Sequence, residues 1–263
     1  MNFTRCIVPI QRQIDAKRFE QFGSGVLLKI AKRYLLVSAA HVILNDRLWI
    51  FGEPENTELN NVEFITTAPD LAGVKDDVAD IGFGYLPEAV AQHLLANNFE
   101  FLPVDQTSYN FRKSTNRAAF SGFPCTKSKL RISAGEMILQ PVFIEGELLS
   151  IKKLEEAGYD PDVHLATRYR RKEQFNAQTK ERINGVDPYG MSGGPVWRFS
   201  ESHEPWLAGI GTDYDSSQEM LKGTRFEAVL GLIQQQSVDE FIRSRSGTVE
   251  TIIIDLPSKK PKR

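Results

Sequence analysis

Cysteine is scarce in this chain, and long apolar runs are missing from it. Only Cys6 and Cys125 occur among 263 residues, far apart and outside any motif. They could form one bridge, but two reduced thiols are the simpler interpretation, which excludes a multi-disulfide framework and predicts a cytoplasmic location. The longest apolar stretch, residues 34–44, covers 11 residues and is too short to cross a bilayer. The N-terminal residues 1–10 contain too short an apolar run for a signal peptide.

The chain also lacks a strong charge of either sign and is poor in histidine. A net charge of −2 gives no general reason to expect nucleic acid or an anionic membrane as a partner. The four histidines include no pair at helical i, i+4 spacing, and no cysteine pair accompanies them, so no metal site is predicted. Basic residues do gather in 168–182. A solvated loop face is favoured there over an acidic or nucleic-acid partner, because no aromatic side chains are interleaved.

What the chain does contain is a glycine-rich turn around a serine. Residues 188–197 read PYGMSGGPVW and run directly into an apolar, strand-like segment. A serine hydroxyl becomes a good nucleophile only when a base takes its proton and donors stabilise the oxyanion that forms. Glycines allow a tight turn that can aim the N–H groups of Gly190 and Ser192 at one point. Taken alone, the segment could also be an ordinary turn between strands.

Two further segments carry a histidine and an acid beside expected strands. Residues 23–30 and 34–39 are apolar runs on either side of a charged turn, which predicts a β-hairpin that ends just before His41. Asp80 opens an alternating strand over residues 81–85. Each of these residues has an ordinary interpretation as well, because a single histidine is often part of a core and an aspartate before a strand is often a turn former.

Together, in the order His41, Asp80, Ser192, the three segments resemble the trypsin/chymotrypsin-like serine peptidases. The separations of 39 and 112 residues suit a histidine and an acid on one barrel and a serine on the next. Small-Ala-Ala-His, Asp followed by an apolar strand, and Gly-x-Ser-Gly-Gly-Pro are all matched. The resemblance covers roughly residues 20–225, most of the chain.

The resemblance implies an all-β fold of two packed antiparallel six-stranded β-barrels with a C-terminal helix. Residues 1–105 would form the barrel that carries His41 and Asp80. Residues 106–263 would form the barrel that carries Ser192, and would end in a helix and a basic tail. The length and a hydrophobic share of 41% suit a two-barrel protein. Strands are expected near 6–10, 22–30, 34–39, 47–51, 61–67, 80–85, 130–140, 142–149, 164–170, 194–199, 206–212 and 222–228, and helices over 87–97 and 229–243.

The activity that the resemblance implies is hydrolysis of a protein or peptide substrate, without a metal or an organic cofactor. Ser192 would attack the carbonyl while His41 takes its proton, and Asp80 would hold the imidazole in the useful tautomer. The backbone N–H groups of Gly190 and Ser192 would form the oxyanion hole.

Other residues of the same types compete for these roles. Asp76 and Asp77 precede Asp80, which is preferred because an apolar strand follows it directly. The remaining histidines lie on an expected surface helix or in polar, turn-rich segments: His93, His164 and His203.

The side chain bound before the scissile bond depends on the pocket. The resemblance places its floor six residues before the nucleophile, at Val186, which favours a small or medium aliphatic side chain. Asp187 beside it and Asp213 on the matching wall could instead recruit Lys or Arg, because a buried carboxylate needs a cation or hydrogen bonds. Thr212 and Tyr214 lie on the same wall, and Tyr214 could narrow the entrance.

The segments also indicate a branch of the family. Residues 23–26, Gly-Ser-Gly-Val, followed by Ala-His, look like the intracellular and bacterial high-temperature-requirement branch. Val42 stands where secreted relatives often carry cysteine, and residues 1–20 show no zymogen-insertion signature. The second barrel needs most of the chain after Ser192, which leaves no room for a PDZ domain.

Two questions about function stay open. As an enzyme, the protein could be always competent, or latent until a separate activating protein partner binds it in a bacterial stress or defence system. The alternative to an enzyme is a catalytically silent pseudopeptidase that acts as a protein-binding scaffold. The presence of all three candidate catalytic residues argues against that alternative.

Overall fold

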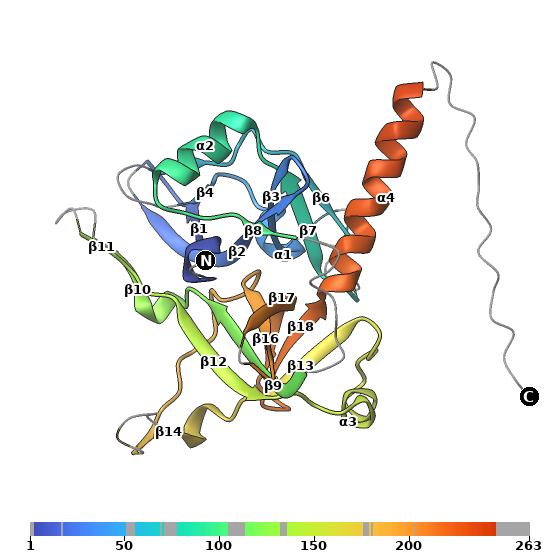
Figure 1. The fold of residues 1–263 in the computed structure, drawn as a ribbon. Coiled ribbons are helices and arrows are strands. Elements are labelled where there is room, and N and C mark those ends of the chain that lie inside the picture. Colours follow the sequence, from blue (N-terminus) through green and yellow to red (C-terminus); the bar gives the residue numbers. More distant parts are fainter. Residues whose placement is uncertain are drawn as a thin grey trace, which may run out of the picture.

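Two curled antiparallel β-sheets make up most of the molecule, and a long helix leaves the side of the second sheet (Figure 1). The computed structural model describes residues 3–16, 18–50, 56–68, 70, 78–104, 114–131, 136–175, 179, 181–202 and 204–245. The predicted basic tail and the boundary between the predicted halves near residue 105 lie outside these residues.

The first sheet has the strand order β5-β4-β1-β2-β3-β7-β6, and β8 pairs with β2. The predicted hairpin is confirmed: β2 and β3 pair from Val26 with Val37 to Ile30 with Arg33. Two short strands, β5 and β8, join the six that were expected. The bounds are β1 (Ile7–Gln13), β2 (Phe19–Ile30), β3 (Arg33–Ala39), β4 (Leu48–Ile50), β5 (Thr57–Glu58), β6 (Phe64–Thr66), β7 (Ile81–Tyr85) and β8 (Leu102–Pro103).

The second sheet has six strands in the order β12-β9-β16-β17-β18-β13. A bridge between Leu148 and Thr167 links the ends of this path, so the sheet curls round towards closure. The bounds are β9 (Ser114–Gly122), β12 (Val142–Glu147), β13 (His164–Arg168), β16 (Pro195–Ser200), β17 (Pro205–Asp215) and β18 (Met220–Arg225).

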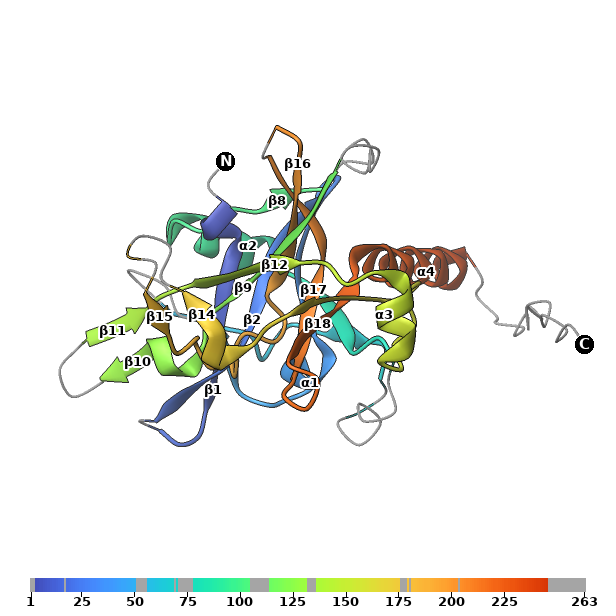
Figure 2. The same cartoon turned by 90° about the horizontal axis from the view of Figure 1, so that it is seen from below.

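The strand expected over 130–140 is wrong as a barrel strand. Instead, β10 (Ser128–Arg131) and β11 (Glu136–Leu139) pair with each other as a separate two-stranded sheet. A second small pair, β14 (Gln174–Phe175) and β15 (Arg182–Ile183), lies on the same side of the molecule, away from the long helix (Figure 2).

Helices occupy the connections and the end of the described chain. The expected helix over 87–97 is α2 (Glu88–Ala96). The C-terminal helix α4 (Phe226–Arg245) starts earlier than predicted, because β18 ends at Arg225. No described helix combines the length and the apolar character that crossing a membrane requires. The others are η1 (Phe3–Cys6), α1 (Ala40–Ile43), η5 (Cys125–Lys127), α3 (Ile151–Glu156) and η7 (Arg171–Glu173).

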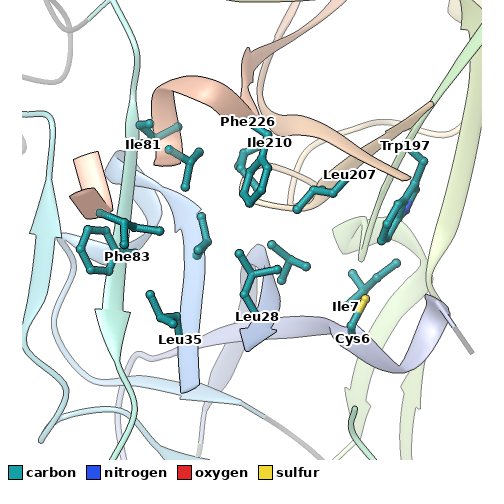
Figure 3. Packing of buried hydrophobic residues seen from close by; sticks show 14 of the residues in the cluster. Cys6, Ile7, Leu28, Leu35, Ile81, Phe83, Trp197, Leu207, Ile210 and Phe226 are labelled. Atoms are coloured by element: carbon teal, nitrogen blue, oxygen red, sulfur yellow. The ribbon is translucent and has the colours of Figure 1, made fainter. Parts of the chain in front are cut away.

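The largest apolar cluster lies between the two sheets rather than inside either one (Figure 3). It joins Leu28 and Phe83 of the first sheet to Ile210 of the second and to Phe226 at the start of α4. Trp197 is 1% exposed within it, and its indole N–H donates to Ser121 Oγ at 2.9 Å. Separate clusters fill each sheet's own interior. The shared cluster therefore fixes how the two halves of the site face one another.

Candidate active site

His41 and Asp80 are brought together by the pairing of β3 with β7. Ala39 pairs with Ile81, so the residues that follow one strand meet the residue that precedes the other. His41 Nδ1 lies 2.8 Å from Asp80 Oδ2, and the backbone N–H of His41 donates to Asp80 Oδ1 at 3.0 Å. The Asp80 side chain is 14% exposed and that of His41 33%. The acid is thus held on the inner side of the imidazole, and the ring stays open to a ligand.

Asp80 has a left-handed backbone, with φ 48°. Aspartate and asparagine tolerate this region better than most residues do. The conformation is held by the two contacts with His41 and by the backbone N–H of Ala40, which donates to the Asp80 carbonyl at 3.1 Å. The competing acids Asp76 and Asp77 lie outside the described residues.

Two glycines make the Ser192 turn possible. Gly190 has φ 94° and Gly193 φ 88°, a region that other residues rarely adopt. A Cβ on Gly193 would stand 2.0 Å from both the Ser24 carbonyl oxygen and Ser38 Oγ. The turn therefore packs closely against the strands that lead to His41.

The N–H groups of Gly190 and Ser192 point away from the carbonyls that share their peptides. The Tyr189 carbonyl accepts from the backbone N–H of Cys125 at 2.9 Å, and the Met191 carbonyl accepts from Gly194 at 3.0 Å. Because a trans peptide sets its N–H opposite its C=O, both donors face the other way. Neither donates to a backbone carbonyl of another described residue. Two available donors are what an anion at this turn requires.

Ser24, which the sequence reasoning did not single out, ties the turn to the first sheet. Its N–H donates to the Ser192 carbonyl at 2.7 Å, and its Oγ donates to the Gly190 carbonyl at 2.9 Å. That oxygen also accepts from the N–H of Phe123 at 2.8 Å, while Ser38 Oγ donates to the Ser24 carbonyl at 2.7 Å. Both serines lie in quoted motifs, but only the three-dimensional packing shows that they reach residues 190–193.

No hydrogen bond joins Ser192 to His41, two residues that the structure describes. Gly193 nevertheless lies against Ala39, since a Cβ on it would be 3.0 Å from the Ala39 nitrogen. The turn that carries Ser192 therefore lies beside the end of the strand that leads to His41.

A cavity of about 350 Å³ opens beside Ser192. Arg171 NH1 lies 2.7 Å from Asp187 Oδ2, so this acid already has a cation. Asp213 is exposed and accepts from the N–H of Tyr214 at 2.7 Å. Four of the five residues predicted for the pocket line the cavity: Asp187, Thr212, Asp213 and Tyr214.

The fifth, Val186, is a described residue that is not part of this lining. Its carbonyl instead accepts from the Tyr169 hydroxyl at 2.8 Å, and the Tyr169 ring meets Tyr214 edge-on with centroids 5.7 Å apart. Burial raises the pKa of Tyr169 to about 12, so its hydroxyl remains a donor. The apolar lining of the cavity includes Phe120, Met191 and Leu221.

The other predicted histidines lie on other elements or outside the described residues. His93 is half-buried on α2, and His203 lies outside the described residues. His164 is 4% exposed on β13, contrary to its assignment to a polar turn. In the described part of the chain, no group of three or more His, Cys, Asp or Glu side chains could hold a metal ion.

No protein-family model matches the chain, and no curated protein matches it in sequence. Solved structures do. Neuropsin, a serine protease expressed in mouse brain, is 14% identical with a TM-score of 0.56, over 89% of this chain and 94% of that one. The serine protease domain of the Sesbania mosaic virus polyprotein is 12% identical with a TM-score of 0.48, over 86% of this chain and 90% of that one. The likeness to neuropsin identifies the fold as a chymotrypsin-like double barrel; at this identity it shows the fold alone.

Proposed function

We propose that this protein is a serine endopeptidase whose Ser192, His41 and Asp80 form a catalytic triad. One observation carries the proposal: His41 Nδ1 lies 2.8 Å from Asp80 Oδ2, beside a turn in which the N–H groups of Gly190 and Ser192 donate to no backbone carbonyl of another described residue. Residues 1–105 supply the histidine and the acid, and residues 106–263 supply the serine. A protein or peptide is the substrate.

The first half of the reaction forms an acyl-enzyme. Ser192 Oγ attacks the scissile carbonyl carbon as its proton passes to His41 Nε2, and the carbonyl oxygen becomes an oxyanion. The N–H groups of Gly190 and Ser192 donate to that oxyanion, and one such donor contributes about 3–4 kcal/mol to transition-state stabilisation. Asp80 stabilises the imidazolium, which then protonates the leaving amine as the C–N bond breaks.

The second half releases the acid product. Water loses a proton to His41 Nε2 and attacks the acyl carbon, which again passes through an oxyanion held by the two N–H groups. The imidazolium returns the proton to Ser192 Oγ as the ester bond breaks. No metal or organic cofactor takes part in this scheme.

A fluorophosphonate probe tests the nucleophile directly, because it reacts only with an activated serine. Wild type should be labelled, alone or with lysate that supplies an activating partner, and Ser192→Ala should lose both labelling and peptide cleavage while its melting temperature stays unchanged. Ser216→Ala is the matched control, since it removes a hydroxyl from the same cavity. Wild-type labelling of Ser192→Ala would refute the assignment.

We propose that the cavity beside Ser192 receives a neutral, apolar side chain before the scissile bond. Two cations, Arg171 and Lys222, and two acids, Asp187 and Asp213, line it, and the ion pair between Arg171 and Asp187 neutralises the first acid. The rest of the lining includes aromatic and aliphatic side chains. Such a cavity gains most from burying apolar surface.

Removing Arg171 should therefore shift the substrate preference towards cationic side chains before the scissile bond. In Arg171→Ala, Asp187 loses its partner, and cleavage of a peptide library should shift towards Lys and Arg. Arg170→Ala is the control, because Arg170 pairs with Glu173 and Glu219 rather than with Asp187. Cleavage after Lys or Arg by the wild type would contradict an apolar preference.

The same probe tests regulation. We propose that a separate protein partner activates the enzyme in a stress or defence system, as expected for an enzyme of the high-temperature-requirement branch. If the probe labels the protein only after cell lysate is added, the enzyme is latent until a partner binds. If the probe labels the pure protein, the enzyme is active without a partner. Labelling in neither case would favour the scaffold.

We also propose a cytoplasmic location, which the free thiols of Cys6 and Cys125 support.

A further inference from the structure

The segment that leads into Asp80 is held by side chains of the second sheet, although Asp80 itself precedes a strand of the first sheet. His164 Nε2 donates to the Val78 carbonyl at 2.7 Å, and Thr224 Oγ1 donates to the Ala79 carbonyl. His164 and Thr224 are direct cross-strand partners on β13 and β18. One pair of neighbouring side chains thus holds two consecutive carbonyls just before Asp80.

The two donors are themselves firmly placed. His164 is 4% exposed and Thr224 is fully buried. His164 Nδ1 lies 3.1 Å from the Asp160 carbonyl, and the imidazole packs against the Tyr159 ring with centroids 5.6 Å apart. A neutral imidazole donates from one nitrogen only, and we assign that proton to the shorter contact, with Val78. Tyr159 is fixed in turn by its hydroxyl, which donates to Asp215 at 2.8 Å.

This support matters because of the backbone that follows it. A left-handed residue other than glycine costs of order 1–3 kcal/mol and persists only where its surroundings determine it. Asp80 has φ 48°, and the contacts of Val78 and Ala79 fix the chain as it enters that conformation. A displacement of about 1 Å in a catalytic group can cost of order 100-fold in rate.

We propose that His164, together with Thr224, is a positioning residue that keeps the Asp80 carboxylate opposite His41 Nδ1. His164 acts through the Val78 carbonyl and touches neither substrate nor the reacting atoms. The inference rests on the proposed function for its kinetic readout, but not for its spectroscopic one. Its competitor is a purely structural role, in which His164 only fills space and stabilises the fold.

Two amide substitutions separate these roles. In His164→Gln the side-chain NH₂ stands near the position of Nε2 and can still donate to Val78. In His164→Asn the NH₂ stands near the position of Nδ1 and faces Asp160 only. Both variants remove the ring, so a loss of packing alone would affect them similarly.

The first readout is kinetic. His164→Asn should lower kcat by of order 100-fold with KM unchanged, and His164→Gln should restore most of the loss. The second readout is the low-field proton NMR signal of His41 Nδ1–H, assigned by its loss in His41→Ala. The signal should disappear or broaden in His164→Asn and persist in His164→Gln. Equal kcat and an unchanged signal in both variants, with only a lower melting temperature, would overturn the proposal.

A second pair covers the case in which the His164 variants fail to fold. Thr224→Val keeps the shape of the side chain and removes its hydroxyl, whereas Thr224→Ser keeps the hydroxyl. We expect Thr224→Val to weaken the His41 signal and to lower kcat, and Thr224→Ser to retain both. No difference between the two would contradict the inference. If wild type is labelled by the fluorophosphonate probe neither alone nor with lysate, the proposed function fails, while the NMR comparison still decides the positioning role.

Discussion

At the scale of single residues, Asp80 combines a left-handed backbone with the proposed role of the acid in a catalytic triad. Asparagine tolerates left-handed backbone as aspartate does, so Asp80→Asn should fold with an unchanged urea midpoint. The amide carries no charge to stabilise the imidazolium and favours the wrong tautomer of His41. We expect kcat to fall by about 10⁴-fold, the loss known for this change in a Ser-His-Asp triad. If Asp80→Asn kept its activity, the assignment of Asp80 to the triad would be wrong.

Ser24 is the residue whose importance the sequence did not reveal. Ser24→Ala leaves the Gly190 carbonyl and the Phe123 N–H without their buried partner, which should lower the free energy of unfolding by about 1–3 kcal/mol. The freed turn should also misplace the Gly190 N–H, so kcat should fall more than KM rises. Ser200→Ala, at an exposed pair of hydroxyls, is the control for both measurements.

The two thiols should be unreactive in the folded protein. Burial raises the pKa of Cys6 to about 12 and that of Cys125 to about 11, where the charge of Glu20 adds to the effect. Because the folded pKa is raised, each thiol contributes stability that is fully present below about pH 8.5 and is lost as the pH rises through the folded value. Iodoacetamide at pH 8 should label both cysteines only after unfolding. Rapid labelling of native Cys125 would contradict this.

At the scale of the elements, β17 ends in an acid that fixes its turn. The Ser217 hydroxyl, and then the Tyr159 hydroxyl and backbone N–H groups, lower the pKa of Asp215 to about 2. A lowered pKa contributes stability above the unfolded value of about 4, and this is lost as the pH falls towards 2. The stability difference between wild type and Asp215→Asn, measured by urea unfolding, should therefore be largest near pH 7 and shrink below pH 4. A constant difference would show that the hydrogen bonds act independently of charge.

Strand periodicity predicted the β2–β3 hairpin and β7, because apolar runs and a charged turn are local signals. The strands β10 and β11 show where such signals fail. Their residues are strand-like, but whether they join the barrel or pair with each other depends on partners distant in sequence. The catalytic candidates could be predicted because sequence motifs mark them. The contacts of Ser24 and His164 could not be predicted, because they join residues that are 166 and 86 positions apart in the sequence.

At the scale of the whole molecule, the site and the core have the same organisation. His41 and Asp80 come from the first sheet and Ser192 from the second, and the largest cluster is shared by both. A site divided in this way depends on the sheets keeping one relative position. The shared cluster supplies that restraint, because burying its side chains requires both sheets to be present.

The last prediction tests this union. Ile210 lies in the shared cluster and Leu27 in the cluster of the first sheet, and both are fully buried. Ile210→Ala and Leu27→Ala should each lower the free energy of unfolding by about 2–5 kcal/mol. If the sheets unfold as one unit, far-UV circular dichroism and tryptophan fluorescence will give coincident urea transitions for both variants. Two separate transitions in Leu27→Ala would show that the first sheet unfolds alone, and loss of peptidase activity in the earlier one would show that the second sheet cannot hold the site without it.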